Sequence, residues 1–190
     1  MLSEPSSALR WQTWLPMAAA IAFFMLLTRG SHVLSPVSLP DASLALFLFG
    51  GLYLRRAGWF AVFFVLAAVI DFGMAALDPW QGFCLTNGYW GLIPAYGVLW
   101  LAGLWLAGQR DAYAATPYVM AGVVSATLAF VISTQSYYLY SGRFPDSGII
   151  ESMRHGWEYM PGYLGYTFAY LAVGWLAVRI FRSLSVRLAN

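Results

Sequence analysis

The chain has 190 residues, of which 61% are hydrophobic and only 9% are charged. Soluble domains carry about 25% charged residues, and a chain of this length cannot hide so much apolar surface from water. The composition therefore excludes an ordinary soluble domain. It predicts one all-α integral membrane domain over residues 1–190.

The basic residues are ten arginines, with no lysine, and the net charge is +2. A basic protein can bind nucleic acid, but these arginines lie at the ends of apolar segments and form no patch. We therefore expect no nucleic-acid partner, and we interpret the arginines as signals of membrane topology within a lipid bilayer.

Apolar segments long enough for membrane helices recur along the chain. They predict six transmembrane helices, at about residues 11–28, 41–54, 58–77, 88–108, 116–140 and 160–181. The first segment has no cleavage site after it, so it is expected to be a retained helix. The second is the shortest and is divided by Gly50 and Gly51. Residues 148–159 are expected to form a short interfacial helix.

The arginines are unequally distributed between the two sides of these helices. Seven lie on the side that holds both chain ends (Arg10, Arg55, Arg56, Arg110, Arg179, Arg182 and Arg187), and three lie on the other side (Arg29, Arg143 and Arg154). Because cytoplasmic loops are rich in arginine, both termini are predicted to be cytoplasmic. The reactive side chains then gather on the outer side: His32, Asp71, Asp78, Cys84, His155 and Glu158.

Asp71 lies inside the third apolar segment. A carboxylate at this depth is costly unless it is paired, hydrated or protonated, so functional sites are its common setting. Its expected partners are Arg29, Arg154 or a group of a ligand. The alternative is a structural bond between helices.

Cys84 is the only cysteine, and it lies in a segment rich in glycine and aromatic residues. A thiolate is a soft ligand that suits transition metals. One cysteine cannot build a structural zinc site, but it can supply an axial ligand to a metal already held in a cofactor. The alternative is a small apolar residue that only fills space.

Other outer residues are candidates for ligand contact. His32 and His155 can ligate metal or donate hydrogen bonds, or they can be solvated loop residues. Tyr137 and Trp157 belong to an aromatic cluster denser than a membrane belt requires, which would suit a large, flat, amide-decorated ligand. The sequence has no phosphate-binding motif, so we expect no nucleotide bound by this chain.

The number of helices, the outer site and the spacing of Ala18 and Ala22 in the first helix resemble the S components of energy-coupling factor (ECF) transporters. The combination of His32 with Asp71, Cys84 and Tyr89, the last three within DFGMAALDPWQGFCLTNGYWG, resembles the cobalamin-specific solitary members of that group, the BtuM-like family.

This resemblance implies a subunit of the bacterial cytoplasmic (inner) membrane that binds cobalamin (vitamin B12) from outside for uptake. Cys84 would be an axial ligand of cobalt, and it could displace an upper ligand such as cyanide. Residues implied in substrate binding are Cys84, His32, Asp71, Tyr89, Arg154, Tyr137 and Trp157. Ala18 and Ala22 would face an ECF scaffold subunit that acts with two ATPases.

Two alternatives stay open at this point. Cys84, Arg154 and His155 could form the catalytic set of a membrane cysteine transpeptidase or protease that resembles exosortases. The chain could also be an S component for another vitamin, with Cys84 incidental.

Overall fold

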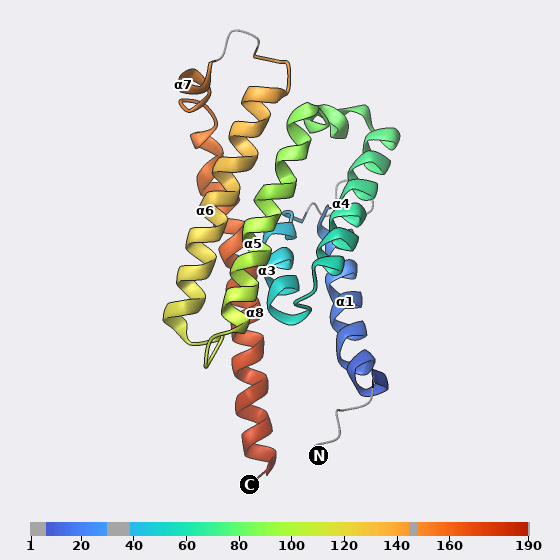
Figure 1. The fold of residues 1–190 in the computed structure, drawn as a ribbon, viewed down its shortest axis with the longest axis vertical. Coiled ribbons are helices and arrows are strands. Elements are labelled where there is room, and N and C mark those ends of the chain that lie inside the picture. Colours follow the sequence, from blue (N-terminus) through green and yellow to red (C-terminus); the bar gives the residue numbers. More distant parts are fainter. Residues whose placement is uncertain (1–6, 30–38, 145–147, 190) are drawn as a thin grey trace.

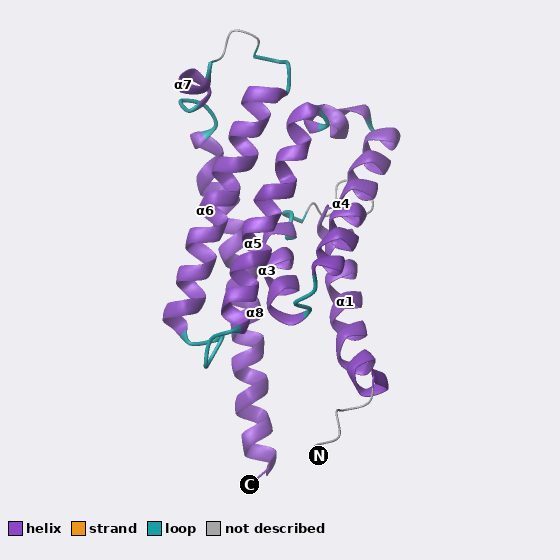
Figure 2. Ribbon diagram, viewed as in Figure 1, coloured by secondary structure: helices purple, strands orange, loops and turns teal. Residues whose placement is uncertain are grey.

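The computed structural model describes residues 7–29, 39–144 and 148–189, and all their regular structure is helical (Figure 2). The longer helices are α1 (Ser7–Arg29), α3 (Ser43–Tyr53), α4 (Ala57–Leu77), α5 (Leu92–Ala107), α6 (Ala115–Tyr140) and α8 (Met160–Ala189). The shorter ones are the 3-10 helices η1 (Pro79–Cys84), η2 (Asn87–Gly91) and η3 (Trp157–Tyr159), and α7 (Ile149–Ser152). The all-helical prediction is confirmed, and each of the six predicted helices has a counterpart.

Among the residues that the structure describes, four helical stretches are long and apolar enough to cross a membrane: Ala57–Leu77, Asn87–Ala107, Ala115–Tyr140 and Ile149–Leu184. Helix α3 has 11 residues. At about 1.5 Å per residue it extends about 16 Å, roughly half of a hydrocarbon core of about 30 Å. The stretch of α1 from Trp14 to Arg29 is also apolar but falls among the shorter helices. The structure thus shows four candidate spans where the sequence predicted six.

The helices run up and down in one bundle (Figure 1). Helix α1 begins and α8 ends at the same end, which we call the terminal end. The turn between α3 and α4 and the connection between α5 and α6 also lie there. The opposite end, which we call the distal end, carries η1, η2 and α7. Short α3 lies in the middle of the bundle, with the longer helices around it.

The contact between α3 and α5 is built on glycine. A Cβ atom on Gly103 would overlap the carbonyl oxygen of Leu48, and one on Gly51 would overlap the carbonyl oxygen of Trp100. Small residues let helix backbones approach closely, which is the main source of helix association in lipid. The glycines that divide the second apolar segment are therefore its packing surface.

Arg55 closes the terminal end of this helix pair. Its backbone is left-handed, with φ 58°. Its guanidinium donates to the carbonyl of Leu52 at 3.4 Å and to that of Ala107 at 3.2 Å, in the last turns of α3 and α5. A cation at a helix C-terminus satisfies carbonyls that have no partner within the helix. One side chain therefore holds both helix ends.

The connections differ from the predicted ones. Residues 78–87, which lie between the third and fourth predicted helices, form η1 and the start of η2, and the helix predicted at 88–108 begins as a 3-10 turn. Helix α8 continues to Ala189, beyond the predicted end at 181. The short helix expected within 148–159 is present as α7, followed by η3.

The glycine contact gives a first prediction. Gly103→Ala should destabilise the protein by about 1–3 kcal/mol, because the added methyl group forces apart backbones that cannot shift independently. Gly97, in the same helix, has open space within 4 Å of the point where a Cβ atom would lie. Gly97→Ala should therefore be neutral or slightly stabilising. Thermal unfolding of both variants in detergent measures the difference, and equal melting temperatures would contradict the close contact.

Candidate functional site

A buried ion pair lies where α1 ends, in the interior of the bundle. Arg29 donates from Nε to Asp71 Oδ1 and from Nη2 to Asp71 Oδ2, both at 2.6 Å. Only 9% of the Arg29 side chain and 19% of the Asp71 side chain are exposed. A bidentate pair of this kind is short, strong and geometrically specific. Of the partners expected for Asp71, the structure shows Arg29.

The remaining nitrogen of the guanidinium joins further helices. Arg29 Nη1 donates to Ser43 Oγ at 2.7 Å, to the Tyr96 hydroxyl at 2.8 Å and to Asp41 Oδ2 at 3.2 Å. These groups belong to the start of α3 and to α5, while Asp71 belongs to α4. Arg29 therefore links four helices, and its role is not confined to signalling membrane topology.

The same cluster completes the start of α3. Asp41 Oδ1 accepts from the Ser43 amide at 2.9 Å and from Ser43 Oγ at 2.6 Å. Thr28 Oγ1 accepts from the Ala42 amide at 3.3 Å. The first N–H groups of a helix have no partner within the helix, so a buried start needs such acceptors. The cluster supplies them.

Tyr89 extends the cluster to the distal end. Its hydroxyl donates to Asp71 Oδ2 at 2.8 Å, which attaches η2 to α4. On the other side of η2, a Cβ on Gly88 would lie 2.7 Å from the carbonyl oxygen of Ser136. Ser136 Oγ in turn donates to the Gly88 carbonyl at 3.0 Å. Segment η2 is thus fixed between α4 and α6, and the expected juxtaposition of Asp71 and Tyr89 is present.

Cys84 ends η1, and its side chain is exposed. Asp78 begins this segment by accepting from the Trp80 amide at 3.0 Å. The turn closes behind the thiol, because the Leu85 amide donates to the Gly82 carbonyl and the Thr86 amide donates to the Cys84 carbonyl, each at 3.0 Å. The cysteine therefore sits on a short ordered helix between two anchored segments.

Arg143, in the connection after α6, holds η1 from the side. Its Nη2 donates to the Phe83 carbonyl at 3.0 Å, and its Cζ lies 3.7 Å from the centre of the Phe83 ring. A guanidinium over an aromatic face is attracted by the ring electrons. The residue next to Cys84 is therefore attached to the end of α6.

The charges around Cys84 shift the pKa of its thiol in opposite directions. Burial raises the pKa of the Cys84 thiol above its usual value, because a low-dielectric surrounding disfavours the thiolate. The positive charge of Arg143 lowers this pKa, and the negative charge of Asp71 raises it. At neutral pH the side chain is therefore a thiol to a greater extent than an ordinary cysteine.

The remaining candidates on the distal side belong to α7 and its surroundings. Arg154 Nη1 lies 3.3 Å from Glu151 Oε2, and His155 Nε2 lies 3.4 Å from Glu151 Oε1. Trp157 donates from Nε1 to the Met153 carbonyl at 2.6 Å. Within the described ranges, no hydrogen bond or ion pair joins Cys84 to Arg154 or His155, so the catalytic set proposed from these three residues is not assembled there.

Four other predicted residues have different settings. Tyr137 on α6 is close enough to Cys84 for their charges to interact. Ala18 is 5% exposed and packs inside the core, and Ala22 is partly buried against that core. His32 lies outside the described residues.

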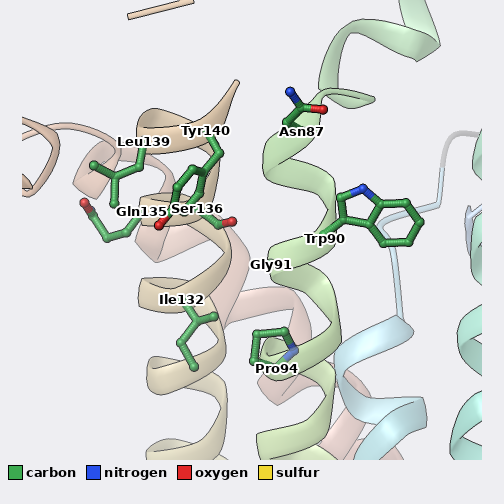
Figure 3. A pocket seen from close by; sticks show the side chains of 9 residues that line it. All are labelled: Asn87, Trp90, Gly91, Pro94, Ile132, Gln135, Ser136, Leu139 and Tyr140. Atoms are coloured by element: carbon green, nitrogen blue, oxygen red, sulfur yellow. The ribbon is translucent and has the colours of Figure 1, made fainter. Parts of the chain in front are cut away.

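A cavity of about 490 Å³ lies between the start of α5 and the end of α6 (Figure 3). Cys84 and Asp71 are not among the residues that line it. Its walls are mainly apolar, with a few polar groups, as in many small-molecule sites. The lining residues are Asn87, Trp90, Gly91, Pro94, Ile132, Gln135, Ser136, Leu139 and Tyr140.

Metal ligands are not clustered in the part of the chain that the structure describes. No group of three or more His, Cys, Asp or Glu side chains is placed there to hold a metal ion. Cys84 contributes one soft donor, which suits a metal that already carries other ligands.

Sequence reasoning missed several members of the site. Ser43 and Tyr96 bind Arg29, and Arg143 binds beside the thiol. Asp41 before Ser43 is a recognisable helix-start signal, so part of this set was visible in the sequence. The contacts of Tyr96 and Arg143 join residues far apart in the chain and carry no local pattern.

The fold thus defines an all-helical protein with several helices able to cross a membrane, as in multi-pass membrane proteins. The sequence matches no protein-family model, and no curated protein matches it.

The buried cluster gives a second prediction. Asp71→Ala should lower the free energy of unfolding by about 3–5 kcal/mol, because it removes the bidentate partner of the buried Arg29 charge and leaves only the half-exposed Asp41 beside it. Tyr89→Phe removes one hydrogen bond to a charged group and should cost about 1.5–3 kcal/mol. Glu151→Gln, at an exposed pair, should change the stability by less than about 1 kcal/mol. Chemical unfolding in detergent micelles checks this order, and an Asp71→Ala variant as stable as Glu151→Gln would contradict it.

The electrostatics of Cys84 give a third prediction. Because only the thiolate is alkylated, a raised pKa should move the pH profile of alkylation by iodoacetamide to higher pH than that of a free cysteine peptide. Arg143→Gln removes the charge that lowers this pKa, so it should move the profile higher still. Rates of alkylation between about pH 6 and about pH 10 measure both effects. A profile at or below that of the peptide would contradict the description.

Proposed function

We propose that the chain is the substrate-binding membrane subunit of a vitamin B12 uptake transporter, and that it binds cobalamin at the distal end. The observation that carries this proposal is the placement of Cys84: an exposed soft donor at the end of an ordered helix, next to the cluster that fixes Tyr89 on Asp71. The resemblance of this segment to BtuM-like proteins supports the choice of ligand.

In this proposal the distal end faces outward from the cytoplasmic membrane of a bacterium. Six helices would cross or enter the membrane, with both termini inside. The arginines of the terminal end support this orientation: Arg55, Arg56, Arg110, Arg179 and Arg182 lie in or next to its turns and helix ends, as cytoplasmic arginines do.

Cys84 would bind cobalt in an axial position. Cobalt in a corrin already has four nitrogen ligands in the ring plane, so a single protein donor suffices. With cyanocobalamin the step is a ligand exchange without electron transfer. The thiol loses its proton, a sulfur–cobalt bond forms, the cobalt–cyanide bond breaks, and cyanide leaves with a proton as hydrogen cyanide.

The polar cluster would act by positioning. Because Asp71 is held by Arg29 on one side and by Tyr89 on the other, the segment that carries the thiol has a fixed base. A ligand-binding side chain is most effective when its supporting contacts leave it one orientation. Tyr137, which lies within electrostatic reach of Cys84, would supply an aromatic contact to a flat ligand.

Cobalamin is too large for the cavity between α5 and α6, so it would need an open surface site. The cavity between α5 and α6 has about 490 Å³. That volume lies in the lower half of the range of roughly 300–1,000 Å³ for drug-sized ligands, and a corrin is larger than these. The corrin would therefore rest across the distal face, with Arg154 and Trp157 at its rim.

Partners of this subunit would bind elsewhere. A membrane scaffold subunit with two cytoplasmic ATPases would supply energy, because the chain has no phosphate-binding motif of its own. Helix α1 has exposed residues for such a contact, among them Leu15 and Phe23, beside the more buried Ala22 and Ala18.

The fourth prediction tests cobalt binding directly. Purified protein mixed with cyanocobalamin should change its visible spectrum and release cyanide, whereas Cys84→Ser should bind more weakly and leave the spectrum unchanged. Leu77→Ala, an exposed apolar change just before η1, is the matched control and should behave as the natural protein does. Because the ligand is the thiolate, the affinity should rise with pH until the thiol has titrated.

Each outcome has a separate meaning. Failure to bind cobalamin would contradict the proposal. If calorimetry showed binding of a different, colourless vitamin, that vitamin would take the place of cobalamin as the proposed ligand. Cobalamin binding with the same spectrum in Cys84→Ser would keep the uptake function but remove the cobalt ligand.

A further inference from the structure

Helix α7 presents an exposed apolar surface. Ile149, Ile150 and Met153 are 66%, 76% and 55% exposed. These positions lie side by side on one face of the helical turn. We refer to these three residues as the α7 apolar face. An exposed apolar cluster of this kind marks a surface that is covered by a partner or by lipid.

The charged side chains of the same turn are paired with one another. Glu151 contacts both Arg154 and His155, on the side of the turn away from Ile149. Because the negative charge of Glu151 already faces the positive charge of Arg154, the turn offers little charge to a polar partner. The segment is thus amphipathic, with a self-paired polar side and an unpaired apolar side.

The segment after α7 is fixed to α6. Gly156 has a positive φ of 87°, and a Cβ there would overlap Thr134 Cγ2 and lie 3.0 Å from Tyr138 Cε2. The His155 ring stacks on Tyr138 at 5.6 Å between centres. The Trp157 ring lies 5.9 Å from that of Phe130. These contacts set the position of the α7 apolar face along α6.

That position corresponds to the boundary of a bilayer. Helix α6 has 26 residues. At about 1.5 Å per residue it is about 39 Å long, longer than a hydrocarbon core of about 30 Å, so its last turns reach the headgroup layer. Segment 155–157 packs on those turns. Tyr140 and Tyr159, 62% and 66% exposed, lie close by and are typical of this layer.

We infer that the α7 apolar face inserts into the boundary between acyl chains and headgroups of the outer leaflet, so that its partner is the lipid surface. Helix α7 also begins the helical stretch Ile149–Leu184, which by length and composition can cross a membrane. Helices with one apolar and one charged side bind membranes in this way. The choice of the outer leaflet rests on the orientation in the proposed function, but the insertion of this face into lipid does not depend on cobalamin.

The fifth prediction compares two exposed positions of this turn. In a Cys84→Ser background, Ile149→Cys and Arg154→Cys are each labelled with an environment-sensitive fluorophore and reconstituted into vesicles of phosphatidylethanolamine and phosphatidylglycerol. Ile149 is 66% exposed and the Arg154 side chain is 72% exposed, so neither label disturbs the core. Lipids brominated near the glycerol should quench the label at 149 at least about twofold more than the label at 154, as expected for a face buried about 5–10 Å.

Other results would overturn the inference. Equal quenching at both positions, or a label at 149 that stays accessible to aqueous iodide, would show that this face is not in lipid. A label at 149 that is shielded from iodide but not quenched by lipid, and that forms cross-links between chains, would identify a second copy as the partner. Normal elution of both labelled proteins in size-exclusion chromatography controls for folding.

Discussion

The bidentate pair between Arg29 and Asp71 is the interaction on which the rest of the structure depends. Helix α3 starts inside the bundle, and its first amides need acceptors that lipid and apolar side chains cannot give. Asp41 and Thr28 provide these acceptors. The charge of Asp41 is tolerated there because Arg29 lies beside it. Removal of Asp71 would leave the buried Arg29 with only the half-exposed Asp41 as a counter-charge, so the cluster holds together as a unit.

Close backbone contacts complete what the cluster begins. Gly103 and Gly51 bring α5 against α3, and Gly88 brings η2 against α6. Each contact excludes side chains and therefore fixes the distance between two elements within narrow limits. The cluster sets how α1, α3, α4 and η2 are joined, and the glycines set how far apart their neighbours lie. Cys84 lies between α4 and η2 in the chain, so the polar cluster and the glycine contacts together set its position.

The sequence was sufficient for the helices and for part of the site. Long apolar segments located all the main helices, because helix length in a membrane follows from hydrocarbon thickness. The isolated Asp71 in such a segment indicated a buried partner. What could not be predicted was the choice of partner: Arg29 and Asp71 are 42 positions apart, and Arg143 and Phe83 are 60 apart. No local pattern encodes such contacts. The position of short α3 among the other helices could not be predicted either. Hydropathy does not distinguish a short buried helix from part of a transmembrane helix.

Helix α6 supports both η1 and the α7 segment at the distal end. Arg143, just beyond its last turn, binds the Phe83 carbonyl next to Cys84, and Tyr138 stacks on His155 of the α7 segment. A face held in lipid through α7 would therefore restrict the same helix end that orients η1. Helix α6 also contacts η2 through Ser136. The segment that carries the thiol is therefore held by α6 and by the Asp71 cluster. The thiol is then fixed by the contacts beneath it while its side chain stays exposed, which is the arrangement that the proposed binding of a large ligand across the distal end requires.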